Sequence, residues 1–482
     1  MVSATAPKDR VKASWLFAYS LPGLPIAALG LPLAVHLPNF YAVEVGLGYA
    51  AVGTIFGLAR FLDVFLDPIM GVISDRTRSP WGRRRIWMVI AVPIMIAAAV
   101  LVFMPAPGVS MGYVVASMIF LFVGWTMLTI SHLAWGGEMT GDYHERSRVT
   151  ASREAAYVIG MIAVLMLPVL IQNYGEAWGF GSDRFAQISA MGWFIIITMP
   201  IGVGIAVLVI KETNIPAAAH LPLGPAIAAI WNNQALRYVL VCDLIAGISG
   251  GIVATLFIAM ATVGLGLGKQ ANLLLLIYFF MGVVFIPPMV LLSRYLGKHQ
   301  TLVLSSLINA VLIPCIMLVP KGDFITAMIL WTFLGMNMSV GPFLFRAIMA
   351  DVADHDHVET GQPRAGVYFA LLALTNKLGY SSAVVLSFWT LAFIGFSEKG
   401  VNTPETVQNM MLLYVVPAGV ISVIVAAVMW RFPLTEAKHR EIRSILEERG
   451  LAGTAIGARV GHTLEDEPEE EPAGAPVAKP AE

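Results

Sequence analysis

Three ionisable side chains share an apolar stretch near residue 60. Asp63 and Asp67 are four residues apart and Arg60 precedes Asp63 by three, so a helix would bring all three to one face. Each charged residue at the centre of a membrane helix costs about 2.5–3.5 kcal/mol on insertion scales. Two neighbouring carboxylates also repel each other unless a proton or metal cation lies between them. The spacing predicts a cation site; alternatively, Arg60 neutralises one carboxylate and the other packs against a helix end.

A basic, turn-rich loop follows this stretch directly. It contains Asp75, Gly82 and the run Arg83, Arg84 and Arg85. Short loops rich in arginine lie on the cytoplasmic side of a membrane. We therefore expect the carboxylate pair to lie inside the bilayer and the loop to lie at the cytoplasmic surface.

The composition of the chain is that of a multi-span membrane protein. It has 482 residues, of which 57% are hydrophobic and only 13% are charged, too apolar for a water-soluble protein of this length. The net charge of -1 gives no indication of a nucleic-acid partner, and we expect a monomer. Both cysteines, Cys242 and Cys315, stand in apolar segments and are expected to be small apolar fillers, not a disulfide or a metal site.

Apolar runs long enough to cross a bilayer occur twelve times, so the sequence predicts an all-α membrane protein with twelve transmembrane helices in two six-helix halves. The predicted spans are 14–42, 49–75, 86–105, 111–138, 150–172, 187–210, 235–263, 270–293, 300–319, 323–349, 365–394 and 407–430. Prolines interrupt the first span, which is typical of a helix that lines a cavity.

The division into halves follows from a polar, proline-rich linker. We expect an N-terminal half over 1–210, a cytoplasmic linker over 211–234, a C-terminal half over 235–431 and a partly disordered cytoplasmic tail over 432–482. The basic loop after span two has a weak echo after span eight, and the acidic end of span four has one after span ten. Two echoes in the same order indicate a parallel duplication, an arrangement that places the binding site between two transporter halves.

Lysine and arginine set the expected orientation. The loops after even-numbered spans carry most of these residues, whereas those after odd-numbered spans carry only Arg184, Lys269, Lys321 and Lys399. Both termini are therefore predicted to be cytoplasmic, in a multi-pass protein of the inner (plasma) membrane.

One more intramembrane charge is Lys377, about a dozen residues into span eleven. A buried ammonium needs a carboxylate partner, and Asp63 or Asp67 of the other half could supply it. Such a lysine would sense whether the cation is bound. The alternative is a lysine that extends to the cytoplasmic interface.

Span four offers further polar groups near its middle. The hydroxyl oxygens of Thr126 and Thr129 suit a hard cation such as Na⁺, although membrane threonines also bond to their own backbone. His132 and Trp135 lie on a neighbouring face, where they could contact a substrate or simply pack. Asp243, early in span seven, could contact a substrate or pair with Arg237.

Several catalytic motifs are absent from the sequence. It has no phosphate-binding loop of the Walker type, no serine elbow, no zinc-binding HExxH pair and no cysteine-histidine cluster. We therefore expect neither an enzyme nor ATP-driven transport and no cofactor, with a membrane enzyme or a transport-dead sensor as remote alternatives.

These motifs resemble those of the glycoside-pentoside-hexuronide:cation symporters, the melibiose-permease-like family of the major facilitator superfamily. The resemblance covers all twelve spans and rests on Asp63-x-x-x-Asp67-Pro-x-x-Gly71, the loop from Asp75 to Arg85, Glu138-x-Thr-x-Asp142-x-x-Glu-Arg146, and Asp351 with Glu359, Arg364, Gly366, Lys377 and Gly379. It implies a sodium- or proton-coupled symporter of a sugar or glycoside that works by alternating access, with a small-molecule substrate and a monovalent cation as its partners.

Site residues follow from the same resemblance. It places Asp63, Asp67 and Thr126 in the cation site and matches Lys377 to the family's conserved lysine. We expect Lys377 to have the coupling role together with Arg60, the charged neighbour of the aspartates on their helix. The family's two sugar-binding aspartates correspond by spacing to Ala27 and Thr129 here. Since the family's lysophospholipid transporters also lack that pair, a lysophospholipid or another amphiphile is the alternative substrate.

Two further sets complete the predicted site. The residues expected to bind substrate are Tyr19, Thr129, His132, Trp135, Asp243, Tyr368 and Asn376. We expect the charges of the basic loop to form a cytoplasmic latch with the acidic ends of spans four and ten, and the residues of this latch are Asp75, Arg83, Arg84, Glu138, Asp142, Asp351 and Asp354. When closed, this latch should favour the outward-facing state.

Overall fold

The computed structural model describes residues 10–106, 108–140, 143–212, 233–338, 340–361 and 364–434, with Lys438, Glu441, Ile442 and Ile445. Within these residues the secondary structure is entirely helical. The N-terminal half contains α1 (Ala13–Ser20), α2 (Gly23–Leu31), η1 (Pro32–His36), α3 (Leu37–Asn39), η2 (Phe40–Glu44), α4 (Tyr49–Arg76), α5 (Arg85–Phe103), α6 (Met111–Glu138), α7 (Tyr143–Tyr174) and α8 (Arg184–Val209). The C-terminal half contains α10 (Gln234–Ala259), η3 (Met260–Gly264), α11 (Ala271–Val284), α12 (Ile286–Leu296), α13 (Lys298–Leu312), η4 (Pro314–Leu318), α14 (Phe324–Met338), α15 (Val340–Thr360), α16 (Ala365–Phe393) and α17 (Pro404–Trp430).

The predicted all-α membrane fold is confirmed. In the described part of the chain, eleven helical segments are long and apolar enough to cross a membrane, and the bent pair α11 and α12 makes twelve. That pair bends by 47° where Pro287 and Pro288 follow the break, because a proline removes a backbone donor and clashes with the preceding turn. The proline-rich first span contains two π-helical segments, η1 and η2, as expected of an interrupted helix.

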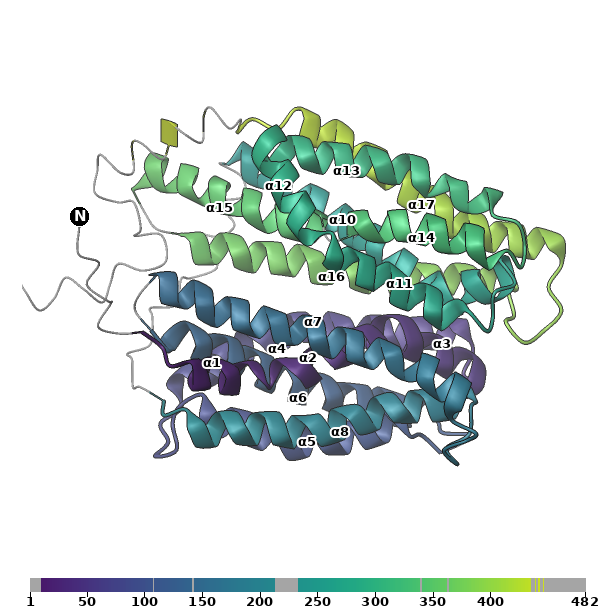
Figure 1. Cartoon of the computed structure of the whole chain (residues 1–482), viewed down its shortest axis with the longest axis horizontal. Coiled ribbons are helices and arrows are strands. Elements are labelled where there is room, and N and C mark those ends of the chain that lie inside the picture. Colours follow the sequence, from purple (N-terminus) through teal and green to yellow (C-terminus); the bar gives the residue numbers. More distant parts are fainter. Residues whose placement is uncertain are drawn as a thin grey trace, which may run out of the picture.

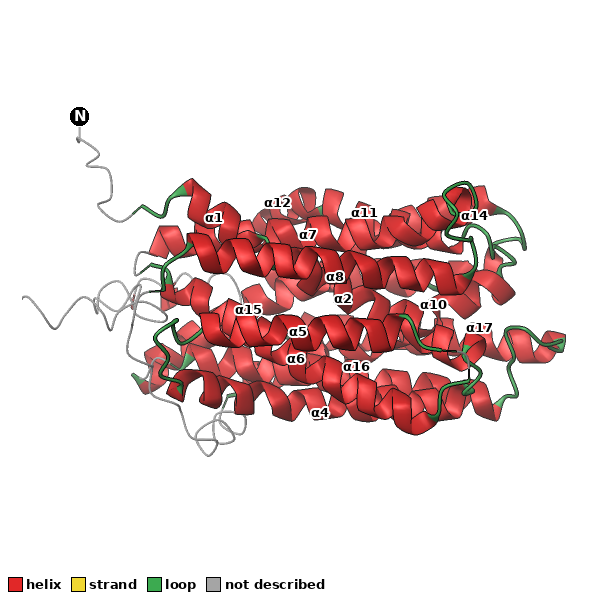
Figure 2. Ribbon diagram, turned by 90° about the horizontal axis from the view of Figure 1, so that it is seen from below, coloured by secondary structure: helices red, strands yellow, loops and turns green. Residues whose placement is uncertain are grey.

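The two halves lie side by side along their length (Figure 1), and the helices run roughly parallel to the long axis in the second view as well (Figure 2). They meet where α4 packs against α16, α7 against α11, and η1 against α10. Gly57 of α4 lies at the contact with α16, since a Cβ there would lie 2.1 Å from Cγ2 of Val385. Most of the expected linker, Asp142 and most of the tail after residue 434 lie outside the described residues.

Glycine also sets the spacing of helices inside the C-terminal half. On α16, a Cβ at Gly379 would lie 2.5 Å from the carbonyl oxygen of Leu244 and 3.0 Å from Cα of Gly247, both on α10. Close backbone contact between small residues is a main source of helix association in membranes, where burial of apolar surface drives little. This contact fixes α16, and with it Lys377, against α10.

A single methyl group tests this contact. Gly379→Ala should destabilise the protein by about 1–3 kcal/mol, the usual cost of overpacking, because neither backbone can move without displacing its helix. Thermal unfolding of the purified protein in detergent measures the change. Gly366→Ala is the matched control, because Gly366 lies on the same helix with nothing within 4 Å of its added Cβ. Equal melting temperatures for the two variants would contradict the prediction.

Candidate functional site

The intramembrane charges meet at one point between the halves. Nζ of Lys377 on α16 lies 2.6 Å from Oδ2 of Asp63 and 2.6 Å from Oδ2 of Asp67, both on α4. The side chains are partly buried, with exposed fractions of 33%, 17% and 30% for Lys377, Asp63 and Asp67. Lys377 therefore binds both carboxylates of the opposite half, and the alternative that it extends to the interface does not apply in this conformation.

Thr126 and Arg60 complete this cluster. Thr126 on α6 is buried and donates its hydroxyl to Oδ1 of Asp63 at 2.9 Å. Arg60 stands one turn before Asp63 on α4, with its guanidinium carbon 6.0 Å from the centre of the Tyr380 ring, a cation–π contact. Its Nε is buried and has no hydrogen-bond partner among the described residues.

The formal charges of this cluster balance. Asp63 and Asp67 contribute two negative charges, and Arg60 and Lys377 contribute two positive ones. In a poorly hydrated place an added cation would leave an excess positive charge, which is costly. Entry of a cation is therefore favoured when Lys377 leaves the carboxylates.

A cavity of about 260 Å³ lies in the C-terminal half of the described structure. Asp243 and Asn376, two predicted substrate residues, line it. Asp243 accepts a hydrogen bond from the Thr375 hydroxyl at 2.7 Å, and the Asn376 side-chain amide lies 3.5 Å from its other oxygen. Asp243 thus receives its hydrogen bonds from α16, directly beside Lys377.

Other predicted substrate residues lie away from this cavity. Tyr19 and His132 are buried in the N-terminal half, where the Tyr19 hydroxyl donates to the carbonyl oxygen of His132 at 3.0 Å and Nε2 of His132 lies 2.7 Å from the carbonyl oxygen of Tyr19. Trp135 is 2% exposed and belongs to the same core. The contacts of these three side chains fit the packing alternative.

Thr129 and Tyr368 also have other contacts. The Thr129 hydroxyl donates to the carbonyl oxygen of Trp125 at 2.8 Å, the local backbone bond that was the alternative for this residue. Tyr368 is fully buried in the second core cluster of the C-terminal half, and the side-chain amide of Asn233 lies 3.4 Å from its hydroxyl. Neither residue lines the cavity.

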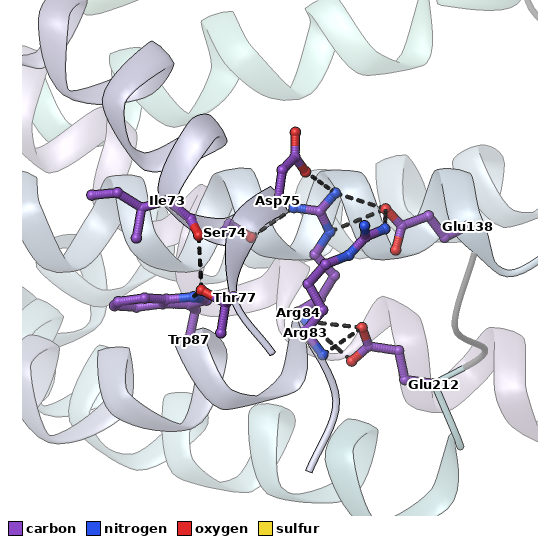
Figure 3. A network of polar contacts seen from close by, with 9 residues as sticks. All are labelled: Ile73, Ser74, Asp75, Thr77, Arg83, Arg84, Trp87, Glu138 and Glu212. Atoms are coloured by element: carbon purple, nitrogen blue, oxygen red, sulfur yellow. Dashed lines mark hydrogen bonds and ion pairs between the residues drawn. The ribbon is translucent and has the colours of Figure 1, made fainter. Parts of the chain in front are cut away.

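The basic loop after α4 forms an ion-pair network within the N-terminal half (Figure 3). Glu138, at the end of α6, binds Nη2 of Arg83 at 2.8 Å and Nη2 of Arg84 at 2.7 Å. Arg84 also donates to Ser74 at 2.7 Å and pairs with Asp75. Burial alone would lower the pKa of Arg84, but the hydrogen bonds and charges of Glu138 and Asp75 outweigh it and raise that pKa above its ordinary value.

Glu212 is a member of this network that the sequence analysis missed. Its carboxylate accepts hydrogen bonds from the backbone N–H groups of Arg83 at 2.8 Å and Arg84 at 2.9 Å (Figure 3). The backbone N–H of Arg85 donates to it as well, at 3.1 Å. These groups lie at the N-terminus of α5, where unpaired donors and the helix dipole favour an anion. Glu212 follows the last apolar run of the half, and its position in sequence gave no sign of this contact.

The C-terminal half has an equivalent pair. Lys298, in the echo of the basic loop, lies 2.6 Å from Oδ1 of Asp351 on α15. The segment that resembles the basic loop and the segment that resembles the acidic end of span four therefore lie beside each other in the second half, as Arg83 and Glu138 do in the first half. Arg83 and Arg84 bind Glu138, the expected partner at the end of span four, while Asp351 binds Lys298 of its own half in this conformation. A latch that also reaches the end of span ten stays a prediction. Asp354 lies on α15, half-buried.

Ion pairs that join the two halves lie at the opposite end, where η2 ends and α4 begins. Arg184 of the first half pairs with Glu398 of the second, and Lys399 lies 2.5 Å from Oε2 of Glu44. Amides add to this contact: Asn272 donates to the side chain of Gln187 at 3.0 Å. We call the four charged residues Glu44, Arg184, Glu398 and Lys399 the far gate. The sequence analysis did not assign them a role.

Charge reversal tests the far gate. Arg184→Glu should open this end, because Glu398 and Glu44 would then face a third carboxylate, and Arg184→Glu combined with Glu398→Arg should close it again. The measurement is the rate at which a membrane-impermeant maleimide labels Thr262→Cys, placed in the 80 Å³ cavity beside the gate, in a Cys242→Ala, Cys315→Ala background. Labelling that is equally fast in all three proteins would contradict the prediction.

The chain is similar in sequence and fold to known membrane transporters. A family model described as "MFS/sugar transport protein" matches residues 18–436. The putative glycoside/cation symporter YagG of Escherichia coli is 23% identical, over 87% of this chain and 92% of its own. The human sodium-dependent lysophosphatidylcholine symporter 1 is 21% identical, over 91% of this chain and 89% of its own. The inward-open structure of the xylose transporter XylE from E. coli shares the fold, with a TM-score of 0.60, 14% identity, and coverage of 90% of this chain and 98% of that one.

Proposed function

The chain belongs to the MFS/sugar transport protein family of membrane transporters, and from this premise we propose that it is a cation-coupled symporter that carries a sugar or glycoside by alternating access. One observation carries the proposal: Lys377 of one half holds Asp63 and Asp67 of the other at 2.6 Å each. A contact of this kind joins the halves electrostatically at the depth where transporters of this architecture bind ligands.

In the proposed cycle, the cation and Lys377 compete for the same carboxylates. The conformation described here is the one in which Lys377 binds them. When a cation binds, the charge balance favours release of Lys377, and α4 and α16 are then no longer tied together. Because a ligand changes a conformational equilibrium only through a difference in affinity between states, this exchange supplies the link between cation binding and alternating access.

We propose Na⁺ as the coupling ion, with H⁺ as the alternative. Protonation would need only one carboxylate, whereas the cluster offers oxygen atoms of Asp63, Asp67 and the buried Thr126 hydroxyl. Hard cations take oxygen ligands. The orientation proposed from charge, with both termini cytoplasmic, puts the far gate on the outer side, so that this conformation is closed to the outside.

Lysophospholipid transport is the second candidate. It is supported by the human relative, a sodium-dependent lysophosphatidylcholine symporter, and by Ala27 and Thr129, which stand where the sugar-transporting members have aspartates. The same cation cluster would serve either substrate.

Transport against a gradient tests the proposed function. Asp63→Asn, Asp67→Asn and Lys377→Gln should each abolish Na⁺-driven accumulation of labelled neutral glycosides in proteoliposomes, because either the cation loses a charged ligand or its competitor is gone. Downhill exchange should persist. Glu405→Gln, on the exposed first turn of α17, is the matched control and should accumulate substrate normally. Accumulation by the double variant of Asp63 and Asp67 would refute the assignment of the cation site.

A further inference from the structure

The cavity of about 260 Å³ is built almost entirely from one half. Its walls come from the helices of the C-terminal half, and Val35 of η1 adds a contact from the N-terminal half. The volume is just below the range of about 300–1,000 Å³ typical of small-molecule sites. A ligand inside it would therefore contact the C-terminal half far more than the surface between the halves.

One wall of the cavity is polar. Ser305 and Asn309 lie four residues apart on α13 and so share a face, opposite Asn337 on α14. Asn337 is 4% exposed, and its amide nitrogen donates to the carbonyl oxygen of Ser305 at 2.7 Å. Its Oδ1 is buried and has no hydrogen-bond partner among the described residues. An unsatisfied buried acceptor is costly, so a ligand that donates a hydrogen bond to it gains affinity.

A carboxylate faces the same space. Asp243 is 4% exposed and accepts bonds from Thr375 and Asn376, which leaves acceptor positions on both oxygens for further donors. Hydroxyl groups of a ligand would fill them. An anionic ligand such as a glucuronide would instead meet a like charge, which disfavours it.

The remaining wall is aromatic. Trp331 is 1% exposed and Tyr414 is 2% exposed, and Phe257 packs edge-on against Trp331 with the ring centres 6.2 Å apart. Aromatic walls combined with a few fixed polar groups are typical of sites that hold a small ligand in one orientation. The apolar face of a sugar ring fits such a wall.

A choline head group would also fit an aspartate among aromatic rings. It carries no hydrogen-bond donor, however, so it would leave the acceptor of Asn337 unsatisfied and make no use of Asn309. The polar wall therefore favours a ligand with several hydroxyl groups over a quaternary ammonium.

We infer that this cavity of the C-terminal half binds a neutral polyhydroxylated substrate, which is held by Asp243, Asn309 and Asn337 against Trp331. The inference rests on the proposed function and specifies its substrate class and place. It also supplies a connection to the cation, because Asn376 on the cavity wall is the residue before Lys377 on α16. Movement of Lys377 away from the carboxylates would move the cavity wall.

The test is binding to the purified full-length protein. The probes are neutral methyl glycosides of common hexoses and pentoses, methyl glucuronide, and lysophosphatidylcholine, each followed by thermal shift and by intrinsic tryptophan fluorescence, to which the buried Trp331 contributes. At least one neutral glycoside should bind, and Asn309→Ala and Asn337→Leu should each weaken it by about tenfold or more, the usual effect of one lost hydrogen bond in a closed site. Asn173→Ala, on the exposed end of α7, is the control and should leave its affinity unchanged.

Three results would overturn the inference. In the first, a neutral glycoside binds, but its affinity is unaffected by Asn309→Ala and Asn337→Leu and is lost in Thr129→Ala. In the second, only the glucuronide or only the lysolipid binds. In the third, no neutral glycoside binds to protein whose melting temperature rises with Na⁺. Asn309 is half-buried, so its variant keeps the test valid if Asn337→Leu unfolds. Failure of the proposed function looks different: the glycoside binds with the expected variant pattern, but neither Na⁺ nor Asp63→Asn alters its affinity.

Discussion

The ion pairs of Lys377 with Asp63 and Asp67 are the interaction on which the rest of this structure depends. A lone charge at this depth would destabilise its helix, so each of these residues is tolerated because its partner lies across the contact between α4 and α16. Removing one partner leaves an uncompensated buried charge. The stability lost in this way is far larger than the net stability that the intact pair contributes. In the proposed cycle the same property makes the site responsive to a cation, since a cation that took the place of the ammonium would satisfy the carboxylates and release Lys377.

The surrounding helices connect this site to the rest of each half. Close contact of Gly379 with the backbone of α10 fixes α16 to the C-terminal half, and the network around Glu138 and Glu212 fixes α4 and α5 within the N-terminal half. Each half can therefore move as a unit. The far gate then opposes separation of the halves at one end. Such rocking of two rigid halves around a central site is the general mode of alternating access.

Much of this arrangement could be predicted from sequence, for a physical reason. The pairing of Lys377 with the aspartates follows because intramembrane charges are few and must satisfy one another. The residues that line the cavity were harder to predict, because polar and aromatic side chains occur on every face of a membrane helix and only packing decides which face lines a cavity. Tyr19 and His132 bind each other's backbones, whereas Asn309 and Asn337 gave no pattern that distinguishes them. Glu44 and Glu398 could not be recognised as partners in ion pairs between the halves, because isolated charges at helix ends are common. Only the tertiary fold brings Glu44 to Lys399 and Glu398 to Arg184.

The competition between Lys377 and the cation is the central claim, and the affinity of the substrate-free protein for Na⁺ tests it most directly. Isothermal titration calorimetry should be carried out on the wild type, Lys377→Ala and Asp63→Asn, with thermal unfolding used to verify that each is folded. Loss of the competing ammonium should tighten Na⁺ binding in Lys377→Ala by about tenfold or more, an advantage of at least about 1.4 kcal/mol, while Asp63→Asn should lose Na⁺ binding. Weaker Na⁺ binding in Lys377→Ala than in the wild type, or unchanged binding in Asp63→Asn, would contradict the account.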